Sequence, residues 1–245
     1  MTMPDTKPMA DARQHLIVAL DYATPEPALR LVETLGESVL YYKVGKELFT
    51  AAGPDVVRQL VAKGKKIFLD LKFHDIPNTV AGAVKSAAAL GVSLMTVHAL
   101  GGSKMLRAAA EAARESPSKP TVLAVTVLTS MDQADMAELG IGGSVEDEVL
   151  RLAGLAIDAG CGGIVTSAKE APKVRQSYGR SFAVITPGIR PAGAAVGDQA
   201  RVVTPTDAIR AGVSHMVVGR PITAAAYPTQ SARAILEEIA GALRG

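Results

Sequence analysis

The residues best suited to chemistry follow an apolar run at residues 67–69. Asp70 and Lys72 are two positions apart, and side chains alternate between the faces of a strand, so we expect both on one face. Asp75 follows in a turn, just before Pro77 interrupts the strand pattern. An ammonium group between two carboxylates stabilises the charged form of each group. This spacing predicts that Lys72 is a proton donor and not a nucleophile. The alternative is an ordinary surface ion pair between Asp70 and Lys72.

Two further charged residues, Asp21 and Lys43, come at the ends of earlier apolar runs. With Asp70, Lys72 and Asp75 they would form an array in which acid and base alternate. Alternating signs lower the electrostatic cost of gathering these charges in one pocket. For Lys43 considered alone, the alternative is a solvated lysine at a strand end.

Residues that could bind a phosphate group lie towards the end of the chain. Gly219 and Arg220 follow the last apolar run, where backbone amides at a helix start and a guanidinium can hold a phosphate together. Arg190 lies in a glycine-rich stretch and, by itself, could equally be a loop arginine in water. Thr129 and Ser130 follow the fifth run and offer hydroxyls that could bind a ligand or cap a turn.

The composition indicates a globular protein. Of the 245 residues, 48% are hydrophobic and 20% are charged, with a formal net charge of +2. Because lysine and arginine are scattered and no apolar run is long enough to span a bilayer, we expect neither nucleic acid nor a membrane as a partner. The single cysteine, Cys161, cannot form an internal disulfide, which is typical of a cytoplasmic protein. We expect no metal site, a structural hydrogen-bonding role for His98 and not a catalytic one, and a turn position for His74.

The elements that must position these residues alternate along the chain. Short β-rich apolar runs alternate with longer amphipathic runs, a pattern typical of βα units on a parallel sheet. The predicted strands are residues 15–21, 41–45, 66–72, 94–98, 122–128, 163–167, 183–186 and 215–219. The predicted helices are residues 47–62, 79–90, 102–114, 145–159, 206–211 and 231–243. Eight strands in this length predict the α/β class and a single-domain (β/α)8 TIM barrel, in preference to a doubly wound open sheet.

The ends of the chain and one internal stretch depart from this alternation. We expect residues 15–245 to form the barrel and residues 1–14 to be a flexible N-terminal extension. Residues 187–201 contain three glycines without periodicity and are predicted to form a long mobile loop. Helix starts are predicted at Thr24, Pro77, Ser144 and Thr204. The chemistry of such a barrel lies at the carboxyl ends of its strands, where the charged residues above are expected.

One string carries a resemblance to a known family. Residues 70–79, Asp-Leu-Lys-Phe-His-Asp-Ile-Pro-Asn-Thr, closely resemble the signature of short, bacterial-type orotidine 5'-monophosphate decarboxylases. Residues 186–191 and 197–199 resemble the phosphate loop of that family, and residues 128–130 resemble its Leu-Thr-Ser motif. The resemblance extends from His15 to Tyr227. It implies a (β/α)8 barrel that converts orotidine 5'-monophosphate to uridine 5'-monophosphate and carbon dioxide, the last step of de novo UMP biosynthesis, without a cofactor.

The resemblance also implies roles for individual residues. The catalytic residues would be Lys72, as proton donor to pyrimidine carbon 6, with Asp70, Lys43 and Asp75. The substrate-binding residues would be Asp21, Lys43, Asp70, Lys72, Asp75, Ile76, Thr79, Thr129, Ser130, Pro187, Arg190, Gln199, Gly219 and Arg220. A cytoplasmic homodimer is implied, with Asp75 contributed across the interface. The alternatives are a magnesium-dependent sugar-phosphate decarboxylase or hexulose-phosphate synthase with the same barrel, and a non-catalytic nucleotide-binding barrel.

Overall fold

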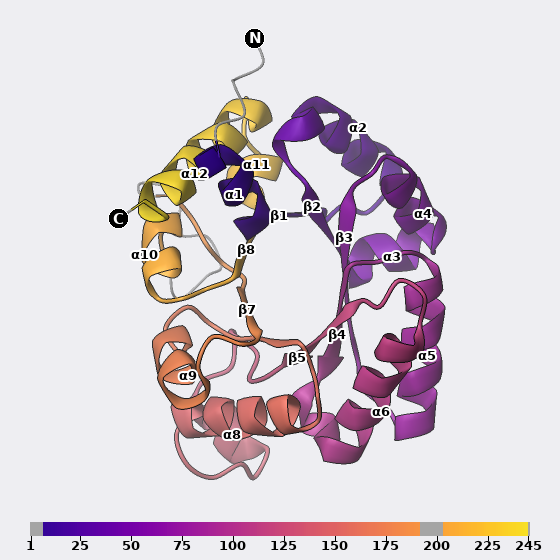
Figure 1. The fold of residues 1–245 in the computed structure, drawn as a ribbon, viewed down its shortest axis with the longest axis vertical. Coiled ribbons are helices and arrows are strands. Elements are labelled where there is room, and N and C mark those ends of the chain that lie inside the picture. The colour runs from indigo at the N-terminus through magenta and orange to yellow at the C-terminus, as the bar shows by residue number, and fades with distance from the viewer. Residues whose placement is uncertain (1–6, 192–202, 245) are drawn as a thin grey trace.

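The described part of the chain folds into a closed barrel of parallel strands with helices around it (Figure 1). The computed structural model describes residues 7–191 and 203–244. The strands are β1 (Leu16–Ala19), β2 (Tyr41–Gly45), β3 (Lys66–Phe73), β4 (Leu94–His98), β5 (Thr121–Val125), β6 (Gly163–Val165), β7 (Ala183–Thr186) and β8 (His215–Val218). Strand β1 pairs with both β2 and β8. This confirms the predicted single-domain (β/α)8 barrel and excludes the open sheet, which would leave its two edge strands apart.

The helices lie on the outside of the barrel, and most of them lie between successive strands of the chain. They are α1 (Lys7–His15), α2 (Pro25–Leu35), α3 (Lys46–Ala52), α4 (Asp55–Ala62), α5 (Pro77–Ala89), α6 (Gly102–Glu115), α7 (Gln133–Glu138), α8 (Val145–Asp158), α9 (Ala171–Tyr178), α10 (Pro205–Arg210), α11 (Arg220–Thr223) and α12 (Pro228–Ala242), with short 3₁₀ helices η1 (Gly36–Ser38) and η2 (Ala99–Gly101). The helix ranges predicted from the sequence did not include α1, α2, α7, α9 or α11, although the start of α2 was predicted at Thr24. Among the described residues, no helix combines the length and the apolarity needed to cross a membrane.

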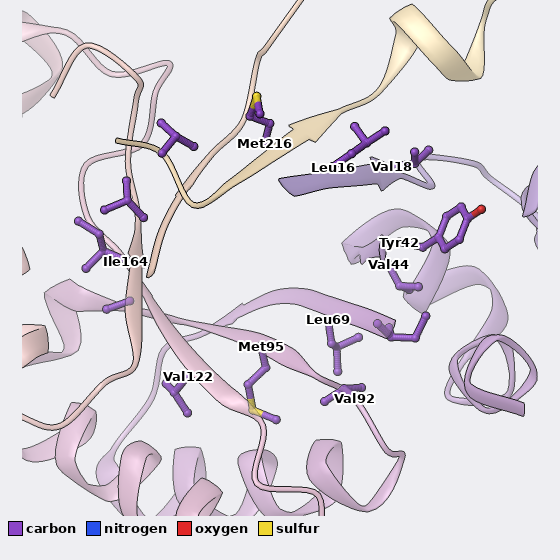
Figure 2. Packing of buried hydrophobic residues seen from close by; sticks show 14 of the residues in the cluster. Leu16, Val18, Tyr42, Val44, Leu69, Val92, Met95, Val122, Ile164 and Met216 are labelled. Carbon is purple, nitrogen blue, oxygen red and sulfur yellow. The ribbon is translucent and has the colours of Figure 1, made fainter. Parts of the chain in front are cut away.

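Two apolar layers hold the barrel together. The interior is filled by Ile17, Ala19, Tyr41, Phe68, Leu94, Leu123, Ile185 and Val217. Their neighbours along the strands, such as Val18, Tyr42 and Leu69, belong to the larger cluster between the sheet and the helices (Figure 2). Because strand side chains alternate faces and both faces are buried, each strand is a nearly continuous apolar run. That continuity is why the strands could be located from the sequence.

The helix predicted at residues 47–62 is in fact two helices, α3 and α4. Gly53 has a φ of 64°, and its amide donates to the carbonyl of Phe49 at 2.8 Å, which ends α3. Pro54 follows and has no amide hydrogen with which to continue the helix. The apolar period passes through this break unchanged, so periodicity alone did not indicate it.

The fifth strand was predicted to reach residue 128, and this was wrong. Strand β5 ends at Val125, because its partner β6 ends at Val165, to whose carbonyl the Thr126 amide donates at 3.1 Å. The first, sixth and eighth strands also end earlier than predicted. Thr129 and Ser130 therefore lie on a loop beyond β5 and not at its end.

The N-terminal extension differs from the flexible segment predicted for residues 1–14. Helix α1 begins at Lys7 and packs against α12 and β8, with Ala12 fully buried. Residues 1–6 lie outside the described residues, and so do residues 192–201 of the predicted mobile loop. At the base of that loop, Ile189 forms a β-bridge with Val203.

The predicted helix starts agree with the structure. Thr24, Ser144 and Thr204 are the N-cap residues of α2, α8 and α10, and α5 begins at Pro77. The Ser144 hydroxyl accepts from the Asp147 amide at 3.1 Å, and the Asp147 carboxylate accepts from the Ser144 amide at 3.3 Å. This reciprocal pair is a capping box, which satisfies two amides that would otherwise lack partners.

Candidate active site

Asp70 and Lys72 lie at the carboxyl end of β3 and pair with each other. Lys72 Nζ donates to both Asp70 oxygens, at 2.8 Å to Oδ1 and 2.9 Å to Oδ2. Both residues line a cavity, whereas Ile67 and Leu69 pack under the helices. The Asp70 side chain is 14% exposed and that of Lys72 is 26% exposed. The pair is thus shielded from bulk water, which strengthens its attraction, and it is not the exposed surface pair considered as the alternative.

The backbone at Lys72 leaves the regular strand conformation. Lys72 has a φ of 52°, in the left-handed region that non-glycine residues rarely adopt. The β3–β4 register also shifts between Leu69 and Phe73, which marks a bulge. Such a conformation costs roughly 1–3 kcal/mol and persists only where surrounding contacts enforce it. The bulge directs the lysine ammonium towards the Asp70 carboxylate at the cavity wall.

Lys43 joins this pair to Asp21. Lys43 Nζ donates to Asp21 Oδ1 at 2.8 Å and lies 4.0 Å from Asp70 Oδ2. The order Asp21, Lys43, Asp70, Lys72 therefore alternates acid and base around the first three strands. The Lys43 side chain is 12% exposed, so it is not a solvated lysine, while that of Asp21 is 58% exposed.

Gly45, at the end of β2, provides the space for this ion pair. A Cβ placed on Gly45 would lie 2.8 Å from Lys43 Nζ and 3.3 Å from Asp21 Oδ1. Its φ of −91° and ψ of −176° are accessible to any residue. Close approach, and not backbone conformation, is therefore the reason for a glycine at this position.

A cavity of about 480 Å³ opens at the carboxyl ends of the strands. The side chains of Ala19, Phe68 and Val217, which also belong to the barrel interior, contribute to its wall. The complete lining is Ala19, Asp21, Lys43, Phe68, Asp70, Lys72, Val125, Val127, Leu128, Thr129, Val165, Pro187, Gly188, Ile189, Arg190, Val217, Gly219, Arg220, Pro221 and Thr223. Polar groups from several strands thus converge on one partly apolar pocket, as ligand sites usually require.

Residues predicted to bind phosphate contribute to the same cavity. Arg190 and Arg220 follow β7 and β8, and they lie in the lining together with Pro187 and Gly219. Arg190 is only 6% exposed, so it is not the solvated loop arginine considered as the alternative. Two guanidinium groups and two ammonium groups therefore line one pocket with two carboxylates, and the excess of positive charge favours an anionic ligand.

Several predicted residues do not line this cavity. Asp75, Ile76 and Thr79 lie in the turn after β3 and the first turn of α5, and all three are exposed. Asp75 Oδ1 accepts from the Ile76 amide at 2.6 Å, and the Ile76 side chain is 66% exposed. Ser130 is also exposed and outside the lining, although Thr129 is in it. Gln199 falls outside the described residues.

His98 lies at the end of β4, next to the charged array. Its ring stacks on His74, with centroids 5.4 Å apart and an interplanar angle of 25°. Burial lowers the pKa of His98, and the nearby His74 and Lys72 lower it further. Its buried Nδ1 has no hydrogen-bond partner within the described residues, so the structure does not support the hydrogen-bonding role expected for it at that atom.

The sequence did not indicate the roles of Thr96 and Gly45 at the charged array, nor which apolar residues line the cavity. Thr96 is completely buried in β4 and hydrogen bonds to both Asp70 and Lys72. It sits among apolar residues in sequence, so the available signal was a threonine inside an apolar strand. Gly45 gave a similar weak signal, a glycine ending a strand next to a charged residue. Nothing in the sequence distinguished the lining residues Val125 and Val217 from ordinary core residues.

The arrangement is suited to proton donation beside an anionic ligand. Lys72 presents an ammonium group to the cavity, and Asp70 fixes the position of that group. The cations on the wall can hold negative charge, and the apolar lining limits the access of water. No cluster of three or more histidine, cysteine and carboxylate side chains placed to hold a metal ion occurs in residues 7–191 and 203–244.

Comparisons with known proteins agree on one family. A model described as "Orotidine 5'-phosphate decarboxylase / HUMPS family" matches residues 14–235. An orotidine 5'-phosphate decarboxylase of Nitrosococcus oceani is 55% identical over 227 residues, which are 93% of this chain and 98% of that protein. The corresponding protein of Halorhodospira halophila is 53% identical over 227 residues, or 93% and 96% of the two chains. The crystal structure of orotidine 5'-phosphate decarboxylase from Lactobacillus acidophilus matches with a TM-score of 0.83 and 42% identity, covering 92% of this chain and 99% of that one.

Proposed function

Because the chain belongs to the orotidine 5'-phosphate decarboxylase / HUMPS family, we propose that it converts orotidine 5'-phosphate to uridine 5'-phosphate and carbon dioxide. This reaction is the last step of de novo UMP biosynthesis. The observation that carries the proposal is the Lys72 ammonium, held 2.8 Å from Asp70 Oδ1 in the wall of the cavity. The relatives from Nitrosococcus oceani and Halorhodospira halophila are both named orotidine 5'-phosphate decarboxylase, and this chain aligns with nearly their whole length.

Lys72 is the proton donor in this proposal. Loss of carbon dioxide from carbon 6 leaves an electron pair in the plane of the pyrimidine ring, where no carbonyl can delocalise it. A neighbouring ammonium stabilises that charge as it develops and then supplies the proton that replaces the carboxylate. Asp70 orients Lys72, and Lys43 connects Asp70 to Asp21 in the alternating array. The array holds the donor in place before the substrate arrives.

The substrate phosphate binds at the β7–β8 side of the cavity. Arg190, Gln199 and Arg220 are the proposed contacts, with Gly219 allowing close approach of the ligand. Support comes from the presence of Arg190, Gly219 and Arg220 in the same lining as Lys72. Binding energy from the remote phosphate can then assemble and dry the site around the ring. Thr129 and Ser130 are proposed to bind the pyrimidine edge, Pro187 completes the contacts, and no cofactor takes part.

The test is the loss of absorbance of the orotate ring on decarboxylation. Lys72→Ala should still bind uridine 5'-monophosphate but should not turn over orotidine 5'-phosphate at a measurable rate. Lys63→Ala is the matched control, because Lys63 pairs with Glu33 at 3.0 Å and does not line the cavity. Substantial turnover by Lys72→Ala would refute its role as proton donor, and an inactive parent protein would refute the proposed reaction itself.

We also propose that the protein is a homodimer in which Asp75, Ile76 and Thr79 complete the neighbouring subunit's site. Support comes from their exposure and from their position outside this chain's own cavity. Ile76 at 66% and Leu100 at 41% are large apolar side chains left exposed after β3 and β4. Mixed Lys72→Ala and Asp75→Asn proteins should regain activity, because each heterodimer would contain one intact site. Failure to regain any activity under conditions of subunit exchange would contradict shared sites.

The family name also includes HUMPS, so the magnesium-dependent sugar-phosphate enzymes are the second candidate. The tail Ile76-Pro77-Asn78-Thr79 and the segment Pro187-Gly188-Ile189-Arg190-Pro191 favour the nucleotide decarboxylase. A chelator separates the two candidates, because loss of activity after metal removal would favour the magnesium enzyme. A non-catalytic nucleotide-binding barrel would show no turnover in either condition. A cytoplasmic location is proposed in keeping with the biosynthetic reaction and the unpaired Cys161.

A further inference from the structure

Thr96 is the one residue of β4 that faces the bulge in β3. The pairs Leu69–Met95 and Phe73–Val97 flank this region, so three residues of β3 lie opposite a single residue of β4. Leu94, two positions earlier on β4, points into the barrel interior, whereas Met95 and Val97 pack under the helices. The alternation of strand side chains therefore directs Thr96 inward. Its side chain has no exposed surface.

The Thr96 hydroxyl makes two hydrogen bonds at the charged pair. Its Oγ1 donates to Asp70 Oδ1 at 2.9 Å and accepts from the Lys72 amide at 2.9 Å. A carboxylate can only accept and a backbone amide can only donate, so the direction of both bonds is fixed. One hydroxyl thereby joins the carboxylate that holds the ammonium to the backbone that carries it.

The bulge explains why such a group is needed. Where the register shifts, the Lys72 amide has no carbonyl of β4 as a regular ladder partner, and a buried amide without a partner is costly. Thr96 Oγ1 serves as the acceptor instead. The left-handed φ of 52° at Lys72 is also a conformation that surrounding contacts must enforce.

We propose that Thr96 is a positioning residue for the Lys72 proton donor. It acts on the reaction through Asp70 and the Lys72 backbone, without touching the substrate. This inference rests on the proposed decarboxylation. With the hydroxyl removed, Asp70 Oδ1 retains the Lys72 ammonium but loses its second donor, and the bulge loses its acceptor. The ammonium is then free to move relative to the ring carbon, so the chemical step suffers more than nucleotide binding.

Three substitutions separate this role from simple packing. Thr96→Val keeps the shape and removes the hydroxyl, while Thr96→Ser keeps the hydroxyl and removes a methyl group. Thr166→Val is the matched control, because Thr166 is 1% exposed, does not line the cavity, and its Oγ1 has no hydrogen-bond partner within the described residues. Each variant is compared with the parent by steady-state decarboxylation and by residue-resolved amide hydrogen exchange.

We expect Thr96→Val to lower kcat by about 10- to 100-fold and to change KM by less than about three-fold, as for loss of a hydrogen bond to a charged group. The Lys72 amide should exchange at least about ten-fold faster in this variant, because it has lost its acceptor. Thr96→Ser should stay within about three-fold of the parent in both measurements, and Thr166→Val should match the parent.

Two results would overturn the inference. One is a kcat of Thr96→Val within about two-fold of the Thr166→Val control. The other is an equal loss of kcat in Thr96→Ser and Thr96→Val, which would assign the effect to packing and not to the hydroxyl. If the proposed decarboxylation itself were wrong, the parent protein would be inactive, so this outcome can be told apart from an error about Thr96. Exchange of the Lys72 amide would still decide whether Thr96 holds that backbone.

Discussion

Substituting alanine for Gly45 should move the Lys43 ammonium without disturbing the barrel. The added Cβ would lie 2.8 Å from Lys43 Nζ and 3.3 Å from Asp21 Oδ1. Non-bonded carbon contacts are favourable at about 3.5–4.0 Å, so the ammonium must retreat by roughly 0.7 Å or more. Alanine can adopt the φ of −91° and ψ of −176° found at this position. The displaced atom ends a flexible side chain, so the backbone need not shift.

The functional cost follows from the contacts that the ammonium makes. Lys43 Nζ lies 2.8 Å from Asp21 Oδ1 and 4.0 Å from Asp70 Oδ2, and a shift of this size breaks the first and alters the second. Displacing a positioned active-site group by about 1 Å can cost about 100-fold in rate, so kcat/KM should fall by about 10- to 100-fold. Because the Asp21 side chain is 58% exposed, its ion pair with Lys43 contributes only about 0–1 kcal/mol to stability. The free energy of unfolding should change by less than about 1 kcal/mol.

The assay is decarboxylation of orotidine 5'-phosphate followed by absorbance, together with urea unfolding. Gly241→Ala in α12 is the control, because its Cβ would meet no atom within 4 Å. It should keep parental activity and gain up to about 1 kcal/mol of stability from the higher helix propensity of alanine. Parental kcat/KM in Gly45→Ala would refute the reasoning. So would a loss of activity matched by a large loss of stability, because the fold and not Lys43 would then be affected.

Two further predictions concern the phosphate contacts and the base of the barrel. Arg220→Ala should lower kcat/KM for orotidine 5'-phosphate by about 100-fold but leave the slow reaction of orotidine, which lacks the phosphate, near the parental rate. Arg210→Ala is its control, and an equal loss with both substrates would contradict the phosphate role. Burial, aided by the charges of His15 and Lys66, lowers the pKa of His215 to about 4. The unfolded chain, with a histidine pKa of about 6.5, binds this proton first on acidification, so His215 should remove about 2 kcal/mol of unfolding free energy between about pH 7.5 and pH 5. Urea unfolding at both pH values should show a smaller decrease in His215→Gln, and an identical decrease in the parent and the variant would contradict this origin.

The sequence by itself determined the fold class and much of the charged array. Strands buried on both faces must be apolar throughout, so the eight runs could be counted and the barrel inferred. The spacing of two between Asp70 and Lys72 placed both side chains on one face, because strand alternation is a local property of the chain. The resemblance of residues 70–79 to one family supplied a specific chemical hypothesis, and the family is the one that the comparisons show.

Only the tertiary structure decided which residues meet across strands. Thr96 is separated from Asp70 by 26 positions, and their contact depends on the register and the bulge between β3 and β4. Gly45 matters because Lys43 and Asp21 converge in front of it, and Asp75 lies outside the cavity despite being three residues from Lys72. Register and closure depend on all eight strands packing at once, whereas sequence patterns report the period of one strand at a time.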